Sequence, residues 1–416
     1  MHNTNFIDIN QFQYLDKVGE GAFGEVYRLR EKKTGFIYAA KFLFNTIPKE
    51  ESSKGSIVNF IRNAAAISKL GYPAIANFIG YSPVDFEQEY KPIIITKFVG
   101  NITLHDFIQL ERKGNLFLRL NDTKKLISIF TIASTMSFLH SLQIIHGNLK
   151  PSNILFDKEK NPIITDYGIT KITQPKQEKD TVIYSSPEAI SDDEYTKEGD
   201  VYSFGMIIYN IFSNEPPFKG YSLKDIRDKI RDGTRPEFDF PIPSAYRQLI
   251  EKCWVKYPSK RPTFDEITEE LRTNAEFITE GISKIEYHNY ISFLSKAQLE
   301  STYTYAKILY NGDGIPSNKE EAARLFERSA KYGHKNSKLA YAIMLDNGDG
   351  IPFDSSKAAI LFKEAADNGD ERAMYIYSIK LSKGDGVSPN AEESAKYGKM
   401  AADCGLAEAI SSYSKI

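Results

Sequence analysis

The stretch 144-IIHGNLKPSNILF-156 decides how this chain is interpreted. Its apolar ends enclose a polar loop that contains His146, Asn148, Lys150 and Asn153. From about Leu104 to Leu271 helical periodicity dominates, and this loop is one of several that interrupt it. Binding and catalytic residues are concentrated in loops that a rigid scaffold positions, so we treat the stretch as a candidate functional loop.

The region before it, residues 12–100, has a different character. Short β-branched and aromatic runs such as "FIYAAKFLF" and "KPIIITKFV" alternate with turn signals, and one helical stretch lies near Phe60–Leu70. This pattern predicts a small sheet with one helix.

A glycine pattern lies within that sheet. The run "VGEGAFGEVY" places Gly19, Gly21 and Gly24 in the order G-x-G-x-x-G, followed by Val26. Alone it is a weak signal of phosphate binding, because any glycine-rich turn in a sheet gives the same string. A third strand-like run follows with "YAAK" and places Lys41 seventeen residues after Gly24. That spacing resembles a protein kinase, in which a flexible hairpin covers ATP and a strand lysine holds the phosphates.

The remaining motifs identify the resemblance more firmly. "HGNLKPSNIL", "ITDYGI", "SSPE", "DVYSFG", "PPF" and "CWVKYPSKRPTF" follow in the order and spacing of kinase subdomains, over residues 12–272. The "CW" with "RPTF" ending and the position of Lys150 resemble the tyrosine-kinase-like branch with serine/threonine specificity. The implied fold is α+β and bilobal, with an N-terminal lobe at about 12–99 and a C-terminal lobe at about 100–272.

The resemblance assigns a role to each matching residue. Asp166 and Asn153 are expected to bind magnesium, since hard oxygen ligands suit a hard cation, and Lys150 to stabilise charge on the transferred phosphoryl group. Glu188 and Arg261 are expected to form a structural ion pair, and Asp200 to brace the catalytic loop. Some positions are expected to contact the phosphates or the adenine of ATP, and one is expected to be the gatekeeper beside the adenine. These positions are Gly19, Gly21, Gly24, Val26, Ala39, Lys41 and, as the gatekeeper, Thr96.

Three departures from the family pattern bear on catalysis. Asn148 stands where an aspartate would accept the proton of the substrate hydroxyl, and an amide cannot take up that proton at neutral pH. Asn63 stands where a glutamate would hold Lys41 toward the phosphates, and Glu50 and Glu51 come more than ten residues too early to replace it. Gly147 replaces the arginine that would bind a phosphate on the activation segment, for example at Thr181 or Tyr184. Nucleotide binding is therefore expected to be weakened and phosphotransfer impaired.

The C-terminal part repeats itself. Gly312, Gly348 and Gly384 are 36 residues apart, as are the alanines 330, 366 and 402. Such a period indicates stacked units, here of two helices each with a Gly-Asp-Gly turn. The features resemble Sel-one-like repeats, relatives of tetratricopeptide repeats, and predict an all-α solenoid at 297–416 after a helical linker at 273–296. Three units and a final capping segment, "GLAEAISSYSKI", are expected, and the implied partners are other proteins.

The composition bears on possible binding partners, on the cellular compartment and on a possible membrane span. The 416 residues carry a formal net charge of −2, which gives no electrostatic preference for nucleic acid. The two cysteines fit no metal-ligand spacing, and the N-terminus shows no secretory signal, so a reduced, cytoplasmic location is expected. Residues 126–145 carry no formal charge over a bilayer-spanning length, but their polar residues gather on one face, which favours a buried helix over a membrane span.

Together these observations predict a pseudokinase: a kinase fold that binds ATP and magnesium but transfers phosphate poorly, joined to a protein-binding repeat array. The first alternative is an active but slow serine/threonine kinase in which Asn148 only orients the hydroxyl. The second is a purely structural adaptor in which the repeats alone are functional.

Overall fold

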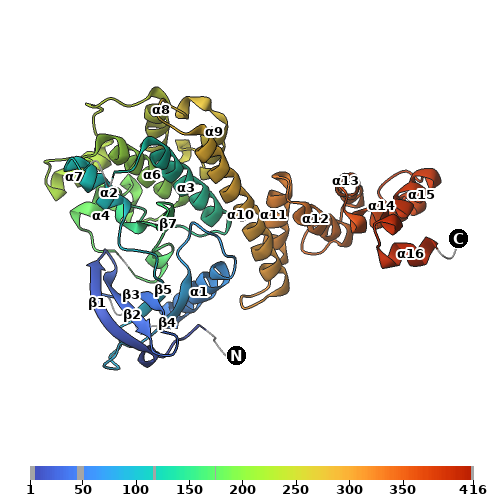
Figure 1. The fold of residues 1–416 in the computed structure, drawn as a ribbon, viewed down its shortest axis with the longest axis horizontal. Coiled ribbons are helices and arrows are strands. Elements are labelled where there is room, and N and C mark those ends of the chain that lie inside the picture. The colour runs from blue at the N-terminus through green and yellow to red at the C-terminus, as the bar shows by residue number, and fades with distance from the viewer. Residues whose placement is uncertain (1–4, 45–50, 116–118, 174, 414–416) are drawn as a thin grey trace. The chain divides into compact units, whose positions relative to one another are not determined.

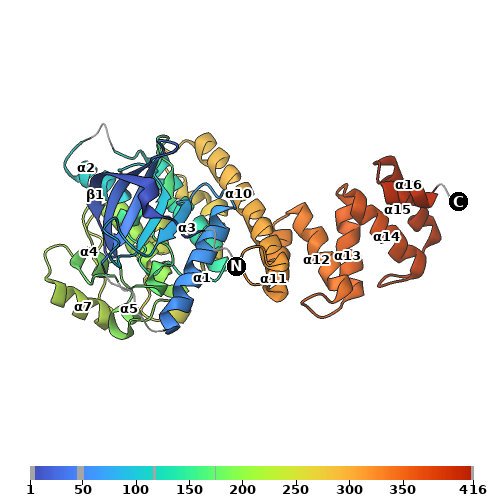
Figure 2. The ribbon, with the colours of Figure 1, turned by 90° about the horizontal axis from the view of Figure 1, so that it is seen from below.

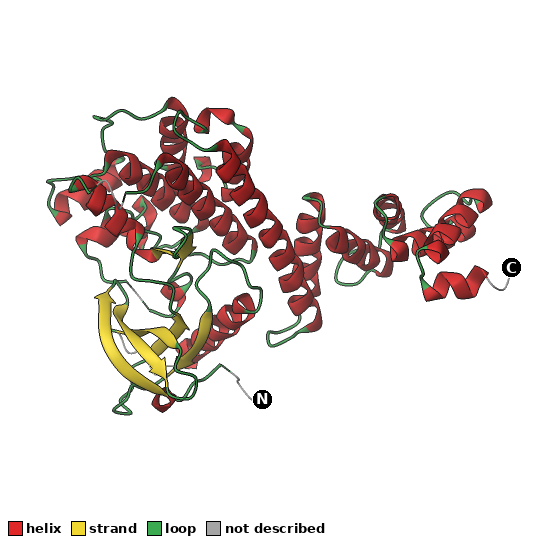
Figure 3. Cartoon of the chain, viewed as in Figure 1, coloured by secondary structure: helices red, strands yellow, loops and turns green. Residues whose placement is uncertain are grey.

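The computed structural model describes residues 5–44, 51–115, 119–173 and 175–413, without the side chains of 51–55 and 413. The chain folds into two compact units, Met1–Gln298 and Leu299–Ile416. The first unit holds a sheet lobe and a helical lobe, and the second contains only helices among its described residues (Figures 1 and 3). This is the expected bilobal α+β fold followed by a helical solenoid.

The sheet lobe is a five-stranded antiparallel sheet in the order β1-β2-β3-β5-β4. One of its hydrophobic clusters joins the sheet to α1 (Glu51–Ser68), and both views show α1 along the sheet (Figures 1 and 2). The helix begins nine residues before Phe60, where the sequence pattern placed its start. The strands are β1 (Phe12–Glu20), β2 (Gly24–Glu31), β3 (Ile37–Leu43), β4 (Phe78–Ser82) and β5 (Ile93–Lys97).

The helical lobe is built around α3 (Asp122–Ser141), which lies against α6 (Lys197–Ser213) and α9 (Phe264–Thr273). A two-stranded ladder of β6 (Ile154–Phe156) and β7 (Pro162–Ile164) follows the candidate loop. No helix of the described residues is long and apolar enough to cross a membrane. The other helices are α2 (Leu104–Arg112), α4 (Lys179–Val182), α5 (Pro187–Asp192), α7 (Leu223–Asp232) and α8 (Ser244–Cys253).

The polar face of α3 is buried as well as its apolar face. Ser134 donates to Gln298 of α10 (Lys284–Asn311), and Ser137 donates to Asp265 of α9. Buried hydroxyls with partners of this kind cost little, because each hydrogen bond to water is replaced by one within the protein. The polar stripe in the sequence therefore marks helix packing and not an exposed surface.

The segment expected to be a linker, 273–296, holds a short 3-10 helix, Ala275–Phe277, and the first part of α10. It belongs to the first compact unit, and α10 continues without a break into the second.

The second unit continues with paired helices that follow one another along the chain (Figure 2). Gly348 and Gly384 end the first helices of their pairs in the left-handed conformation. The last helix packs on the helix before it. It has the place of a first helix in a further pair, and no second helix follows it within the described residues. The helices are α11 (Lys319–Lys331), α12 (Lys335–Asn347), α13 (Ser355–Asp367), α14 (Glu371–Lys383), α15 (Ala391–Asp403) and α16 (Ala407–Tyr413).

The second glycine of a Gly-Asp-Gly turn has a packing role. Gly386 has φ +71°, and a Cβ built there would lie 2.2 Å from the backbone oxygen of Ser355, at the start of α13. The turn of one repeat thus rests directly on the helix start of the repeat before it, which explains why a glycine recurs at this position.

Replacing Gly386 by alanine is expected to destabilise the second unit by about 2–4 kcal/mol, the sum of left-handed strain and a backbone clash. Gly405→Ala is the matched control, because Gly405 has φ +92° and nothing lies within 4 Å of its Cβ position. Calorimetry of the full chain measures both. Equal losses for the two variants would contradict the packing role.

Candidate functional site

A cleft between the two lobes of the first unit collects most of the predicted site residues. The sheet contributes backbone and side chains above it, and the candidate loop and the residues after β7 contribute its floor. The predicted residues that line it are Gly19, Gly21, Val26, Ala39, Lys41, Thr96, Lys150, Asn153 and Asp166. Gly24 and Asn148 do not line it.

Gly24 has a structural explanation. A Cβ at this position would lie 2.0 Å from the carbonyl oxygen of Phe42 in the neighbouring strand. Gly24 therefore allows β2 and β3 to approach each other closely. This packing explains a glycine at the last position of the G-x-G-x-x-G pattern without any contact with a ligand.

Lys41 pairs with Asp166 in this structure. Its Nζ donates to Asp166 Oδ2, and the two side chains are 11% and 13% exposed. Asp166 has a left-handed backbone, with φ +63°. Where side chains are described, no ion pair joins Lys41 to α1, in which Asn63 is half-buried. The side chains of Glu50 and Glu51 lie outside the described residues. The sequence did not indicate which carboxylate pairs with Lys41. In the structure it is Asp166, the residue expected to bind magnesium.

The backbone of the candidate loop is held by one buried carboxylate. Asp200 of α6 accepts the backbone N–H groups of His146 and Gly147, each at 2.8 Å, and a ring nitrogen of His140 at 2.8 Å. Burial lowers the pKa of His146. The backbone N–H of Asn148 donates to His146 Nδ1, which fits a neutral ring. The bracing role expected for Asp200 is present.

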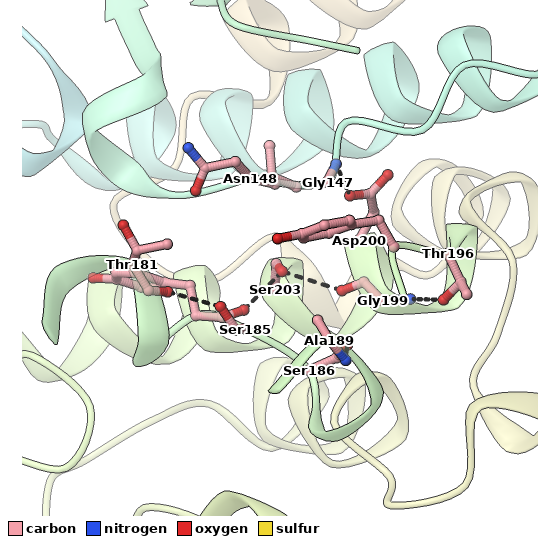
Figure 4. A pocket seen from close by; sticks show the side chains of 13 residues that line it. Gly147, Asn148, Thr181, Ser185, Ser186, Ala189, Thr196, Gly199, Asp200 and Ser203 are labelled. Atoms are coloured by element: carbon pink, nitrogen blue, oxygen red, sulfur yellow. Dashed lines mark hydrogen bonds between the residues drawn. The ribbon is translucent and has the colours of Figure 1, made fainter. Parts of the chain in front are cut away.

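Asn148 lines a small, partly open cavity below the loop. Figure 4 shows its amide on one side, with Thr181 and Ser185 of the segment after Asp166 opposite it. The cavity has a volume of about 20 Å³, which admits one water molecule. Asn148 is 7% exposed, and its Nδ2 finds no acceptor in the described part of the chain.

Hydrogen bonds also hold the other polar residues of the loop. Asn153 donates its Nδ2 to the backbone oxygen of Asn148 at 2.8 Å, which leaves its side-chain oxygen as a possible metal ligand. Thr165, next to Asp166, donates its N–H to the backbone oxygen of Asn153 at 3.0 Å. Lys150 is buried and donates to Thr181 Oγ1 at 3.0 Å, and burial lowers the pKa of its ammonium group.

The segment from Asp166 to Glu188, the activation segment, ends in the predicted ion pair. Glu188 accepts from Arg261 at 2.6 and 3.1 Å. Thr181 and Tyr184 are both buried, and the Tyr184 hydroxyl donates to Asn210 at 2.7 Å. These two hydroxyls are therefore not exposed to a modifying enzyme in this conformation.

Sequence reasoning missed several residues at the cleft. Glu178 and Asp180 of the activation segment line it, and Phe23 is buried at the tip of the glycine hairpin. The order of the motifs gives no signal for these positions, because the path of the activation segment is set by tertiary contacts.

Among the described residues, no group of three or more His, Cys, Asp or Glu side chains is placed to hold a metal ion. The resemblance to kinases leaves Asp166 and Asn153 as the residues expected to supply oxygen ligands for magnesium.

Comparisons with protein families and with known relatives bear on the identity of this chain. Residues 12–271 match the model of the protein tyrosine and serine/threonine kinase family, and residues 299–334, 336–370 and 372–406 match the Sel1 repeat. The chain is 30% identical over 279 residues to the dual specificity protein kinase pyk3 of Dictyostelium discoideum, which covers 64% of this chain and 19% of that protein.

Two further relatives are also named as protein kinases. Dual specificity protein kinase splA of Dictyostelium discoideum is 28% identical over 303 residues, 67% of this chain and 12% of that protein. The serine/threonine/tyrosine-protein kinase HT1 of Arabidopsis thaliana is 27% identical over 323 residues, 75% of this chain and 79% of that protein. The matched region thus spans less than a fifth of the two Dictyostelium proteins. By its match over residues 12–271, the chain belongs to the protein tyrosine and serine/threonine kinase family, and Sel1 repeats follow its kinase domain.

Proposed function

We propose that this chain is a pseudokinase that binds ATP with magnesium, transfers phosphate poorly, and binds another protein through its Sel1 repeats. The observation that carries the proposal is the pairing of Lys41 with Asp166. With Asn63 in place of a glutamate, Asp166 is the carboxylate that pairs with Lys41 among the described side chains, so the same group would have to serve both the lysine and the metal. Lys41 and Asp166, which are both expected to bind the magnesium nucleotide, are paired with each other in this structure.

The cleft residues fit a magnesium nucleotide. Asp166 and Asn153 would hold the metal through oxygen atoms, and Lys41 would contact the α- and β-phosphates once it leaves Asp166. Val26, Ala39 and Thr96 would surround the base. Magnesium, when bound, neutralises charge that develops on the phosphate oxygens. Because the Lys41–Asp166 pair must open first, we expect the affinity to be lower than in a site with a separate lysine partner.

Poor transfer follows from the loop. The Asn148 side chain has no group that takes up a proton at neutral pH, and it lines a small, partly open cavity beside Thr181 and not the cleft. Phosphoryl transfer depends mainly on positioning and electrostatics, so the loss is expected to be about 10²–10⁴-fold and not complete.

A second candidate is a slow serine/threonine kinase. Lys150, Asn153 and Asp166 all line the cleft in this chain, which favours it, as do relatives whose names state serine/threonine or dual specificity kinases. In this case Asn148 would orient the substrate hydroxyl through its carbonyl oxygen.

Two measurements test these proposals. Thermal-shift titration with ATP, with and without magnesium, tests nucleotide binding, because a ligand at 100 times its Kd stabilises the native state by about 2.7 kcal/mol. A transfer assay with radiolabelled ATP separates the pseudokinase from the slow kinase. No shift at any ATP concentration would favour the purely structural adaptor.

Substitutions at the cleft should separate binding from catalysis. Lys41→Ala and Asp166→Ala are expected to weaken ATP binding about tenfold or more, since each removes a charge-assisted contact to phosphate or metal. Asn148→Ala is the matched control and is expected to leave binding unchanged, because Asn148 does not line the cleft. Equal effects in all three variants, measured by the same titration, would contradict the assigned roles.

A further inference from the structure

The outer strand β4 of the five-stranded sheet is covered along its edge by a short piece of the N-terminal chain. The backbone N–H of Ile7 donates to the carbonyl oxygen of Tyr81 at 2.9 Å, and the N–H of Tyr81 donates to the carbonyl oxygen of Asn5 at 2.9 Å. Residues 5–7, which we call the edge segment, thus add one parallel bridge to the sheet.

The β4 strand lacks a side chain at the point where the edge segment comes closest. A Cβ built at Gly80 would lie 2.1 Å from Ile7 Cδ1 and 2.9 Å from the carbonyl oxygen of Asn5. Glycine inside a strand weakens it and often marks a place where another backbone approaches. The Ile7 side chain fills this space and also packs against the hydrophobic cluster formed by β1, β2, β3 and β5. Gly80 therefore suits the β4 edge to a strand that carries a branched aliphatic side chain at this point.

An aromatic contact adds to the fit between the edge segment and β4. The ring of Phe6 meets the ring of Tyr81 edge to face, with the centroids 5.7 Å apart and an interplanar angle of 85°. Tyr81 is 2% exposed and Phe6 is 43% exposed, so the aromatic residue of the edge segment lies at the surface. The edge of β4 thus recognises an extended chain in which a branched aliphatic residue follows an aromatic one.

The edge segment is held by few contacts. Each of its two backbone hydrogen bonds gives a modest net gain, because it replaces a hydrogen bond to water. Phe6 is exposed and Ile7 is half-buried, so neither side chain is enclosed by the protein. A strand from another chain would make the same two backbone bonds to Tyr81, and the exchange of one strand for the other therefore costs little.

A second copy of this chain is a poor source of such a strand. Ile9 is 1% exposed in the same hydrophobic cluster, and the side chain of Asp8 caps the 3-10 helix Ile9–Gln11. The chain is therefore anchored two residues after Ile7. Two extended residues span about 7 Å at most, less than two strand spacings of about 4.8 Å each. The edge segment of one copy could reach the β4 edge of another only if the two edges were almost in contact.

We infer that the β4 edge is a docking site for an extended segment of a different protein. That segment lies parallel to β4, places a branched aliphatic side chain over Gly80 and an aromatic side chain on Tyr81, and displaces the edge segment. The edge segment acts as a built-in competitor, because a tethered strand has an effective concentration of about millimolar. This site belongs to the kinase domain, and it depends neither on nucleotide binding nor on the repeats.

Variants of the full chain and a labelled peptide test the site. The probe is a fluorescein-labelled peptide with the sequence of residues 3–9, NTNFIDI, and its anisotropy is followed during titration with protein in the absence of ATP. Ile7→Asp disables the edge segment without changing β4, so this variant should bind the probe about tenfold or more tightly than the unmodified chain. Adding Gly80→Val should abolish the binding, because valine fills the space that the probe needs.

Two controls are matched to these changes. Phe36→Asp also replaces an apolar residue by aspartate, but Phe36 is 66% exposed just before β3, so this variant should bind the probe as weakly as the unmodified chain. A control peptide that carries Ile7→Asp should not bind to any of the proteins. Should the variant with Gly80→Val not fold, Gly80→Ala replaces it, because a Cβ alone already overlaps Ile7.

Three results would overturn the inference. If Ile7→Asp is folded by circular dichroism but does not bind the probe, the β4 edge accepts no strand from another chain. If Gly80→Val leaves the binding unchanged, or if the control peptide binds equally well, the probe contacts another surface. Sedimentation equilibrium of the unmodified chain gives the third result, since a dimer that Ile7→Asp dissociates would show that the occupant is a second copy.

Discussion

The double variant Asn148→Asp with Asn63→Glu is expected to transfer phosphate from ATP about 10²–10⁴-fold faster than the unmodified chain. The aspartate restores a base for the substrate hydroxyl. The glutamate, on α1, offers Lys41 a partner other than Asp166, so that Asp166 becomes available for magnesium. Autophosphorylation and casein phosphorylation, followed with radiolabelled ATP, measure the rate.

Comparison of Asn148→Asp alone with the variant Asn148→Asp with Asn63→Glu decides which loss is limiting. Asn148→Asp alone is expected to recover little, because a base acts only on a substrate that is already in near-attack geometry. Asn148→Asp with Asn63→Gln is the matched control, since glutamine has the length of glutamate without its charge. If Asn148→Asp alone equals the double variant, the missing partner of Lys41 is not limiting. Robust transfer by the unmodified protein, abolished by Asp166→Ala, would establish the slow kinase instead.

The elements predicted best from the sequence are those with a strong local signal. Three apolar residues in a row, Ile93, Ile94 and Ile95, form the buried part of strand β5, and the 36-residue period predicts the repeat helices. The Gly-Asp-Gly turns recur with the same period, and Gly386 in the third of them has a positive φ, which glycine adopts without strain. In these cases the local preference and the tertiary environment agree, which is why a pattern suffices.

The candidate site was predictable as a set of positions but not as a set of contacts. Motif spacing places Lys41 and Asp166 in one cleft, but with a sequence separation of 125 the spacing does not indicate which carboxylate the lysine selects. The burial of Phe23 depends on the path of the activation segment through space. Contacts between segments so far apart arise from packing, which periodicity and composition do not encode.

The second large effect concerns stability. Arg261→Ala is expected to lower the unfolding free energy of the first unit by about 3–5 kcal/mol, because it leaves a carboxylate without its partner in a largely buried site. The Arg261 side chain is fully buried, pairs with Glu188 and donates to the backbone oxygens of Val255 and Glu198. Trp254, the single tryptophan, is buried in this unit, so its fluorescence in urea reports the unfolding of this unit and not of the repeats.

The pH dependence tests the cause of that loss. Burial raises the pKa of Glu188, but its hydrogen bonds and charge interaction with Arg261 outweigh burial and leave the pKa below its usual value. A depressed pKa stabilises the folded state above the usual glutamate value, about 4.3, and this stabilisation disappears as the pH falls through the folded-state value. The free-energy gap between the unmodified protein and Arg261→Ala should therefore be full at pH 7 and narrow in acid. Arg231→Ala, which removes an exposed ion pair, should cost about 1 kcal/mol or less. A gap for Arg261→Ala that does not change with pH would mean that lost packing, and not the ion pair, causes the destabilisation.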